Sequence, residues 1–188
     1  MGCVIMASGL SRRFGGNKLL ADFHGEPMIM RILHATEGLF DRRVVVTRHQ
    51  EIVRLCAEHG VEVLLHDKPY RSDTVRLGLE AVGNVAGCLF CAADQPLLRR
   101  ETVQLLLAAA QEDPCSIWRP CFDGQVGAPV FFPQWAFEAL RNLPQGKGGG
   151  YVTGIHPDRV RTVPIQNQYE LMDADDREAL ADLLEHDL

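Results

Sequence analysis

The alternation of apolar runs with helical segments constrains the fold of this chain more than any other feature of its sequence. The strand-like runs are residues 2–7, 43–46, 61–65 and 87–93. The helical patterns are residues 28–37, 50–59, 73–81 and 101–111. Because each run is apolar almost throughout, it suits a strand covered on both faces. The alternation therefore predicts a mostly parallel sheet with right-handed crossovers and helices on both faces, a three-layer α/β/α architecture.

The second half of the chain is less regular but continues the same theme. Short strands are predicted at residues 116–118, 130–132 and 159–164, and helices at 134–141 and 175–186. The glycine-rich residues 146–150 interrupt this pattern and predict a mobile loop. Asp173 or Asp175 is expected to cap the closing helix. With 188 residues and no repeat or interdomain linker, we expect a single domain over residues 1–188.

Charge and hydropathy exclude several classes of function. The chain has 19 Lys and Arg residues against 25 Asp and Glu residues, a formal charge of −6, which argues against nucleic-acid partners. It has no apolar run of about 18 residues, so no membrane-spanning helix is expected. Its N-terminus enters an apolar run without a basic region or cleavage site, which predicts a cytoplasmic, reducing location.

The six cysteines fit that location as free thiols. Cys88 and Cys91 have the C-x-x-C spacing, but they lie in an apolar run that predicts a buried strand. A redox pair favours a helix N-terminus, and a zinc site would need further ligands. We therefore interpret both as core residues.

The segment after the first strand is the most informative part of the chain for function. Residues 7–20 contain three glycines, two serines, two arginines and a lysine. They follow a predicted parallel strand, at the edge where open α/β sheets bind ligands. Glycines let backbone N–H groups turn toward an anion, and Arg13 and Lys18 add the positive charge that a polyphosphate needs. The alternative is an ordinary solvated loop.

Two common phosphate motifs do not fit this segment. A P-loop needs G-x-x-x-x-G-K-[ST], whereas Gly16 is followed by Asn17. The dinucleotide motif G-x-G-x-x-G fails because Gly9 and Gly15 are too far apart.

Asp94 directly follows the fourth apolar run and would face the same edge of the sheet. One aspartate together with triphosphate oxygens is a common way to hold Mg²⁺. The alternative is that Asp94 caps the helix expected at residues 101–111.

Together these features resemble a known family. The loop is similar to the signature L-A-A-G-x-S-x-R-x-G-x-x-K of nucleotidyltransferases, with residues 6–9 reading M-A-S-G in place of L-A-A-G. The matching positions are Gly9, Ser11, Arg13, Gly15 and Lys18. The following K-L-L and the D-Q-P triplet that begins at Asp94 resemble the molybdenum cofactor cytidylyltransferases and their relatives.

This resemblance implies the nucleotide-diphospho-sugar transferase fold, with a Rossmann-like, mostly parallel sheet. It implies transfer of CMP from CTP to the molybdopterin phosphate of the molybdenum cofactor, with Mg²⁺ bound and diphosphate released. Arg13 and Lys18 would be catalytic, and Asp94 and Asp175 would bind the metal, with Asp173 as the alternative second ligand. The residues implied to bind nucleotide are Ala7, Ser8, Gly9, Ser11, Arg12, Asp67, Ser72 and Thr74.

Weaker matches extend through the rest of the chain. Gly127 and Pro129 resemble the family's G-x-P-x-x-F segment, and Lys147 its G-D-K-G-A-R segment, which implies that all three lie on the acceptor side. An ordinary edge strand and a flexible loop are the respective alternatives.

Other functions stay open at this point. As a different nucleotidyltransferase, the chain would transfer GMP to the same cofactor, or a nucleotide to a sugar phosphate. In a different class, it would be a non-catalytic nucleotide- or cofactor-binding chaperone. A molybdoenzyme or its chaperone is a further possible partner.

Overall fold

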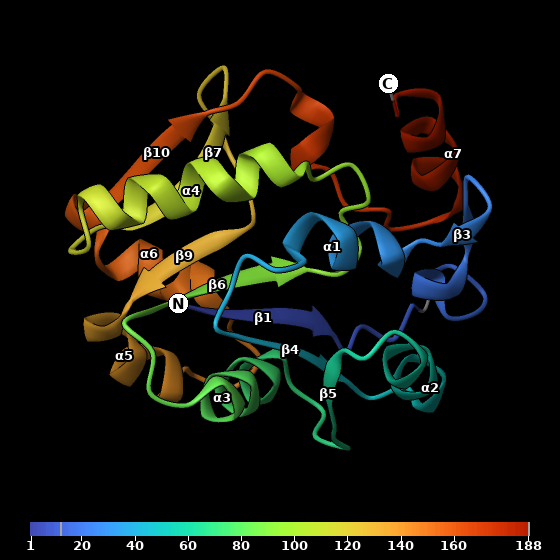
Figure 1. The fold of residues 1–188 in the computed structure, drawn as a ribbon, viewed down its shortest axis with the longest axis horizontal. Coiled ribbons are helices and arrows are strands. Elements are labelled where there is room, and N and C mark those ends of the chain that lie inside the picture. The colour runs from blue at the N-terminus through green and yellow to red at the C-terminus, as the bar shows by residue number, and fades with distance from the viewer. Residues whose placement is uncertain (12, 188) are drawn as a thin grey trace.

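A computed structural model describes residues 1–11 and 13–187 and shows a twisted sheet between two layers of helices (Figure 1). The strand order is β10-β7-β9-β6-β1-β4-β5, with β8 paired to β7 at the side. β6, β1, β4 and β5 run parallel to one another, as do β10 and β7, while β9 is antiparallel to both of its neighbours. The predicted three-layer, mostly parallel fold is confirmed.

The elements have the following bounds. The strands are β1 (Gly2–Ala7), β2 (Asp22–Phe23), β3 (Glu26–Pro27), β4 (Arg42–Thr47), β5 (Glu62–Leu65), β6 (Gly87–Ala92), β7 (Ile117–Phe122), β8 (Gln125–Val126), β9 (Val130–Pro133) and β10 (Val160–Pro164). The helices are α1 (Ile29–Thr36), α2 (Gln50–Glu58), α3 (Arg71–Val82), α4 (Arg100–Glu112), α5 (Phe137–Arg141), α6 (Gly149–Ile155) and α7 (Arg177–Glu185).

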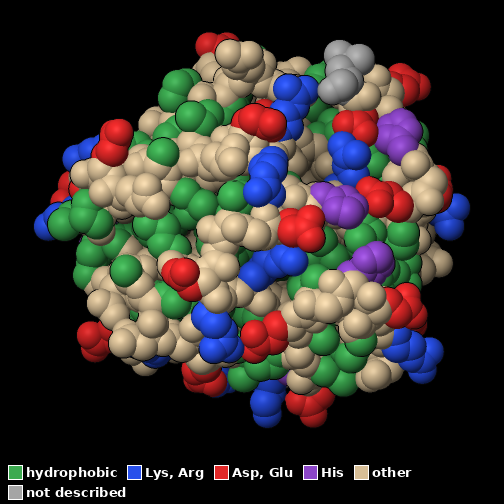
Figure 2. All heavy atoms as spheres, viewed as in Figure 1, with side chains coloured by type: hydrophobic (Ala, Val, Ile, Leu, Met, Phe, Trp, Pro, Cys, Tyr) green, Lys and Arg blue, Asp and Glu red, His purple; other side chains and the backbone are tan. Residues whose placement is uncertain are grey.

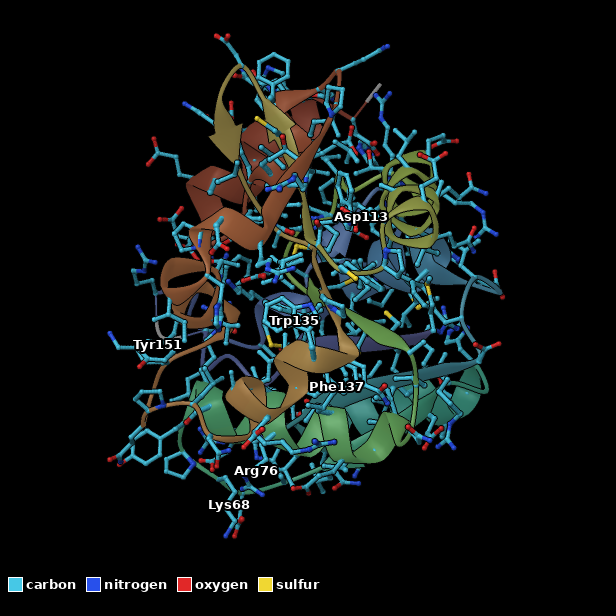
Figure 3. The ribbon with its side chains drawn as sticks, turned by 90° about the vertical axis from the view of Figure 1, so that its left-hand side faces the viewer. Lys68, Arg76, Asp113, Trp135, Phe137 and Tyr151 are labelled. Atoms are coloured by element: carbon cyan, nitrogen blue, oxygen red, sulfur yellow. The ribbon has the colours of Figure 1, made fainter. Side chains whose placement is uncertain are left out.

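Successive residues of the central strands point to opposite faces and so build two cores. Cys3, Ile5 and Val45 pack beneath α1, α2, α4 and α7. Val4 and Val44 pack beneath α3, α5 and α6. Figure 3 labels Phe137 where α5 faces α3, and this ring is buried in the second core. Cys88 and Cys91 are fully buried in β6, one in each core, as the apolar run predicted.

The centre of the sheet fixes where a ligand can bind. β1 and β6 point the same way in Figure 1, so Ser8 and Asp94 emerge at one edge. The buried Thr47 hydroxyl donates to the Ala7 carbonyl at 2.9 Å, which ties the end of β1 to β4. The chain therefore leaves β1 from a fixed point at the carboxyl edge of the sheet, which is where open α/β sheets bind ligands.

Two sequence-based expectations are wrong in the second half. The glycine run is not wholly a loop, because Gly149 and Gly150 begin α6. Glycine disfavours a helix, but Val152 of α6 is fully buried, and a Cβ on Gly149 would lie 2.8 Å from the Phe132 ring. Tertiary packing therefore outweighs propensity here.

The closing helix begins later than expected. α7 starts at Arg177, and its cap is Asp176, whose side chain accepts a hydrogen bond from the Ala179 N–H. Neither Asp173 nor Asp175 serves as the cap, because both line a crevice at the carboxyl edge of the sheet. Within the described residues, no helix is long and apolar enough to cross a membrane.

Alanine substitutions at two helical glycines should change the stability of the protein in opposite directions. A Cβ on Gly78 in α3 would lie 2.4 Å from Val4, whereas a Cβ on the exposed Gly154 in α6 would have no neighbour within 4 Å. Gly78→Ala should lower the free energy of unfolding by about 1–3 kcal/mol through overpacking. Gly154→Ala should raise it by roughly 0.4–1 kcal/mol, because alanine restricts the unfolded chain. Urea unfolding of both variants checks this, and equal shifts would contradict the close packing of α3 on β1.

Candidate active site

Three carboxylates meet at the carboxyl edge of the sheet. Asp94 follows β6, while Asp173 and Asp175 belong to the segment before α7. The Ala174 N–H donates to the Asp94 carbonyl at 2.8 Å, which places its two acidic neighbours beside Asp94. One oxygen from each of the three carboxylates lies within 4.8 Å of the others. Such a set of carboxylate oxygens suits a hard divalent cation such as Mg²⁺ or Mn²⁺.

Two positive side chains form ion pairs with two of these carboxylates. The Lys18 Nζ lies 2.6 Å from Asp94 Oδ2 and 3.4 Å from Asp175 Oδ1, and the Lys18 residue is only 7% exposed. The more exposed Arg13 donates to Asp175 Oδ2 at 2.8 Å. Partial burial opposes ionisation of Asp175, but Lys18 and Arg13 outweigh it and hold the pKa of this carboxyl below its usual value. The cluster is therefore a mixed site of both charges.

Asp173 differs from its neighbours in its protonation. Loss of water within the crevice and the negative charge of Asp94 raise the pKa of Asp173 to about 6, although the residue keeps an exposed surface. Asp173 lacks the direct contact with Lys18 or Arg13 that Asp175 has. A cation bound among the three carboxylates would favour the ionised form of Asp173.

The glycine loop is anchored at several points. Ser11 has a left-handed backbone (φ 49°), and its hydroxyl accepts a hydrogen bond from the Lys18 N–H at 3.2 Å. At the other side, Arg177 of α7 donates to the Phe14 carbonyl at 3.2 Å and stacks over the Phe14 ring. These contacts hold Lys18 at the base of the crevice and keep the C-terminal segment against the loop.

The crevice extends from the carboxylates to a second wall with a different character. Its volume is about 460 Å³. The residues of the second wall include Ser8, Arg48, Tyr70, Arg71 and Thr74. They come from the ends of β1 and β4 and the start of α3, on the opposite side of β1 from Asp94. Hydroxyl, aromatic and arginine side chains thus face the carboxylate cluster across one cavity.

The crevice gathers most of the residues predicted at the nucleotide and metal sites. Those that line it are Ser8, Gly9, Ser11, Thr74, Asp94 and Asp175, with Lys18 and Arg13 hydrogen-bonded to the carboxylates. Ala7 is buried beneath them, and Asp67 lines an adjacent hollow. The Ser72 hydroxyl accepts a hydrogen bond from the Gly146 N–H at 3.2 Å. Arg12 lies outside the described residues.

The three residues predicted on the acceptor side are not among those that line the crevice. Gly127 packs on Leu171, where a Cβ would approach to 2.8 Å, and its carbonyl accepts a hydrogen bond from Arg119 Nε. Pro129 follows a cis peptide bond just before β9. Lys147 is exposed in a loop whose neighbours Gly146 and Gly148 contact the start of α3.

The sequence did not point to several contributors to the crevice. Arg48 and Tyr70 line the crevice, and His66 hydrogen-bonds two of the lining hydroxyls. Arg48 and His66 directly follow β4 and β5, so their place at strand ends was an available signal. The sequence also left the choice between Asp173 and Asp175 open, whereas the structure brings both to Asp94.

A second hollow lies on a different face, between α1, α4 and the end of α7. Figure 2 shows arginine and histidine side chains gathered there. Its volume is about 360 Å³, and two of its arginines are engaged: Arg31 with Asp187, and Arg100 with the Glu37 carbonyl. It contains none of the three clustered carboxylates, so the crevice is the better candidate for catalysis.

Several known proteins resemble this chain in sequence or in fold. The model of the MobA-like NTP transferase domain matches residues 3–160. Over 97 residues the chain is 35% identical to 3-deoxy-manno-octulosonate cytidylyltransferase of Neisseria gonorrhoeae. That match covers 46% of this chain but only 36% of the curated relative.

Solved structures share the fold over almost the whole chain. Rv0371c of Mycobacterium tuberculosis H37Rv superposes with a TM-score of 0.85 at 22% identity, covering 98% of both chains. The same protein has been solved in complex with manganese. A CMP:2-keto-3-deoxy-manno-octonic acid synthetase complexed with CTP has a TM-score of 0.79 at 14% identity, covering 98% of this chain and 96% of the other. At these identities the likeness shows the nucleotide-diphospho-sugar transferase fold.

Proposed function

This chain belongs to the MobA-like NTP transferase family, and from its crevice we propose that it transfers CMP from CTP to an acceptor with release of diphosphate. The observation that carries the proposal is the juxtaposition of Lys18 and Arg13 with three carboxylates at one sheet edge. Such a site offers carboxylate oxygens to a divalent cation and positive side chains to the phosphates that the cation carries. The acceptor we propose is the molybdopterin phosphate of the molybdenum cofactor, which the N-terminal signature and the D-Q-P triplet favour.

Each group has a role that follows from its place. Asp94, Asp173 and Asp175 would hold Mg²⁺, which when bound stabilises negative charge on the phosphates. Lys18, buried at the base of the crevice, stabilises the charge that develops as the α-phosphorus bond to diphosphate breaks. Arg13 is exposed at the rim and orients the triphosphate. Ser8, Gly9 and Thr74 contact the nucleoside on the opposite wall.

The choice of cytosine and of acceptor rests on different support. The curated relative and one of the similar structures are named for cytidylyl transfer, and the latter was solved with CTP. The same names favour a second acceptor, 3-deoxy-manno-octulosonate. GMP transfer, or transfer to a sugar phosphate, remains an alternative within the class.

A diphosphate-release assay tests the proposal. The protein is incubated with Mg²⁺ and each of CTP, GTP, UTP and ATP, with molybdopterin-type cofactor or 3-deoxy-manno-octulosonate as acceptor. We expect diphosphate and the cytidylylated cofactor only when CTP, cofactor and Mg²⁺ are all present. Product formed only with 3-deoxy-manno-octulosonate would show that this sugar acid is the acceptor, and the proposal of cytidylyl transfer would stand. No product from any triphosphate, by a protein that binds CTP and Mg²⁺, would favour a non-catalytic chaperone.

A further inference from the structure

A hydrogen-bonded group of Ser8, His66 and Thr74 lies at the wall of the crevice opposite the carboxylates. The Ser8 hydroxyl oxygen is 2.8 Å from His66 Nε2, and the Thr74 hydroxyl oxygen is 3.4 Å from the same nitrogen. These residues come from the end of β1, the end of β5 and the first turn of α3. Three separate parts of the chain therefore converge on one imidazole.

The surrounding bonds fix where the protons lie. The Lys68 N–H, which can only donate, points to His66 Nδ1 at 3.1 Å. Nδ1 must then be the unprotonated acceptor, and the neutral ring carries its proton on Nε2. Burial, followed by the positive charge of Arg48, lowers the pKa of His66, which favours this neutral form.

The proton on Nε2 sets the polarity of the Ser8 hydroxyl. His66 donates to the Ser8 oxygen, while the Ser8 O–H donates to the Val46 carbonyl at 3.1 Å. A serine hydroxyl has one donor and two acceptor positions. Its donor and one acceptor position are thus occupied by the protein, and the remaining position, on the crevice, can only accept a hydrogen bond.

The position of the three carboxylates in the crevice indicates which part of a nucleotide lies beside Ser8. The carboxylates and Lys18 lie on the β6 side of β1, where a triphosphate with its cation would be held. Ser8 and Thr74 lie on the β4 and β5 side, on a wall that also carries Arg48, Tyr70 and Arg71 and none of the three carboxylates. With the cation and the triphosphate at the carboxylates, the nucleoside extends along this wall.

We propose that Ser8, held as an acceptor by His66, selects a base that carries an exocyclic amino group over one that carries a keto group at the same place. This inference rests on the proposed function and deepens it, because it separates CTP from UTP. The cytosine amino group would donate to Ser8, whereas the uracil keto oxygen would meet a second acceptor. A site built for one hydrogen-bond polarity rejects the opposite one strongly.

Binding measurements with Mg²⁺ and no acceptor test this inference separately from catalysis. Calorimetry of the unmodified protein should show CTP bound about 10- to 100-fold more tightly than UTP. A pyrimidin-2-one ribonucleoside triphosphate, which lacks the amino group, should bind more weakly than CTP in the same protein. Ser8→Ala should reduce the CTP-to-UTP ratio to within about threefold, and His66→Phe should reduce it in the same direction. The matched control is His59→Gln, at an exposed histidine after α2, which should keep the original ratio.

The outcomes distinguish the inference from the proposed function. If the unmodified protein binds neither CTP nor UTP, the proposed function fails. If it binds both equally, or if Ser8→Ala keeps the original ratio, the assignment of Ser8 fails while nucleotide transfer stands. A long-range ¹H–¹⁵N spectrum reports the His66 tautomer independently of any variant, and a proton on Nδ1 would overturn the hydrogen-bond polarity on which the inference depends.

Discussion

Asp94→Asn should lower kcat/KM for diphosphate release by about 10³-fold or more, since every 1.36 kcal/mol of lost charge stabilisation in the transition state costs a factor of ten in rate. Asparagine keeps the shape of the side chain, and the backbone carbonyl that accepts the Ala174 N–H is untouched. The fold should therefore persist, with an unchanged circular dichroism spectrum and a similar melting temperature. Steady-state kinetics over a range of Mg²⁺ concentrations measure the loss.

The matched control is Asp158→Asn. This exposed carboxylate lies just before β10, next to Arg159 and outside the carboxylate cluster. The Asp158→Asn substitution removes the same charge and should leave kcat/KM within about twofold of the unmodified protein, as is usual for surface substitutions. Activity of Asp94→Asn close to that of the control would show that Asp94 is not needed for the reaction. Unfolding of Asp94→Asn would instead make it a structural residue.

Lys18→Met should produce two effects of opposite sign. Turnover should fall by about 10²–10³-fold, because a preorganised positive group near the reacting phosphorus is lost. Binding of Mn²⁺ without nucleotide should become tighter, because the ammonium that now lies 2.6 Å from Asp94 no longer competes with the cation. Kinetics and an electron paramagnetic resonance titration of Mn²⁺ measure the two effects on the same preparation.

A purely structural role for Lys18 predicts a different pattern. If the lysine only supported the fold, Lys18→Met would weaken Mn²⁺ binding and turnover together, in step with a lower melting temperature. Arg54→Met, at an exposed position of α2, provides a control for the loss of one positive charge. It should change neither measurement, and unchanged turnover in Lys18→Met would remove Lys18 from the mechanism.

The fold could be predicted because local patterns agree with tertiary structure in the first half of the chain. The buried strands β1, β4 and β6 are apolar on both faces, so their sequences differ clearly from those of the helices between them. Positions at strand ends, such as Ser8 and Asp94, follow from the shared edge of parallel strands. The start of α6 could not be predicted, since Gly149 is helical through its packing on Phe132.

The rest of the site depends on contacts between residues far apart in the chain. Asp173 and Asp175 reach the crevice because Ala174 bonds to Asp94, and the hydrophobic periodicity of the sequence gives no sign of this contact. Likewise, Ser8 and His66 are 58 positions apart, and their bond depends on the order β1-β4-β5 in the sheet. Residue type indicates that these side chains can bind metal ions or form hydrogen bonds, but only the topology shows which of them are in contact.

The most direct test is a crystal structure with Mn²⁺ and a CTP analogue whose α,β-bridging oxygen is replaced by methylene. The account predicts an anomalous Mn²⁺ peak bound by Asp94 with Asp173 or Asp175, next to the α-phosphate, with Lys18 against the phosphates and the base beside Ser8. A triphosphate bound in the hollow between α1, α4 and α7, or a metal held away from Asp94, would contradict it.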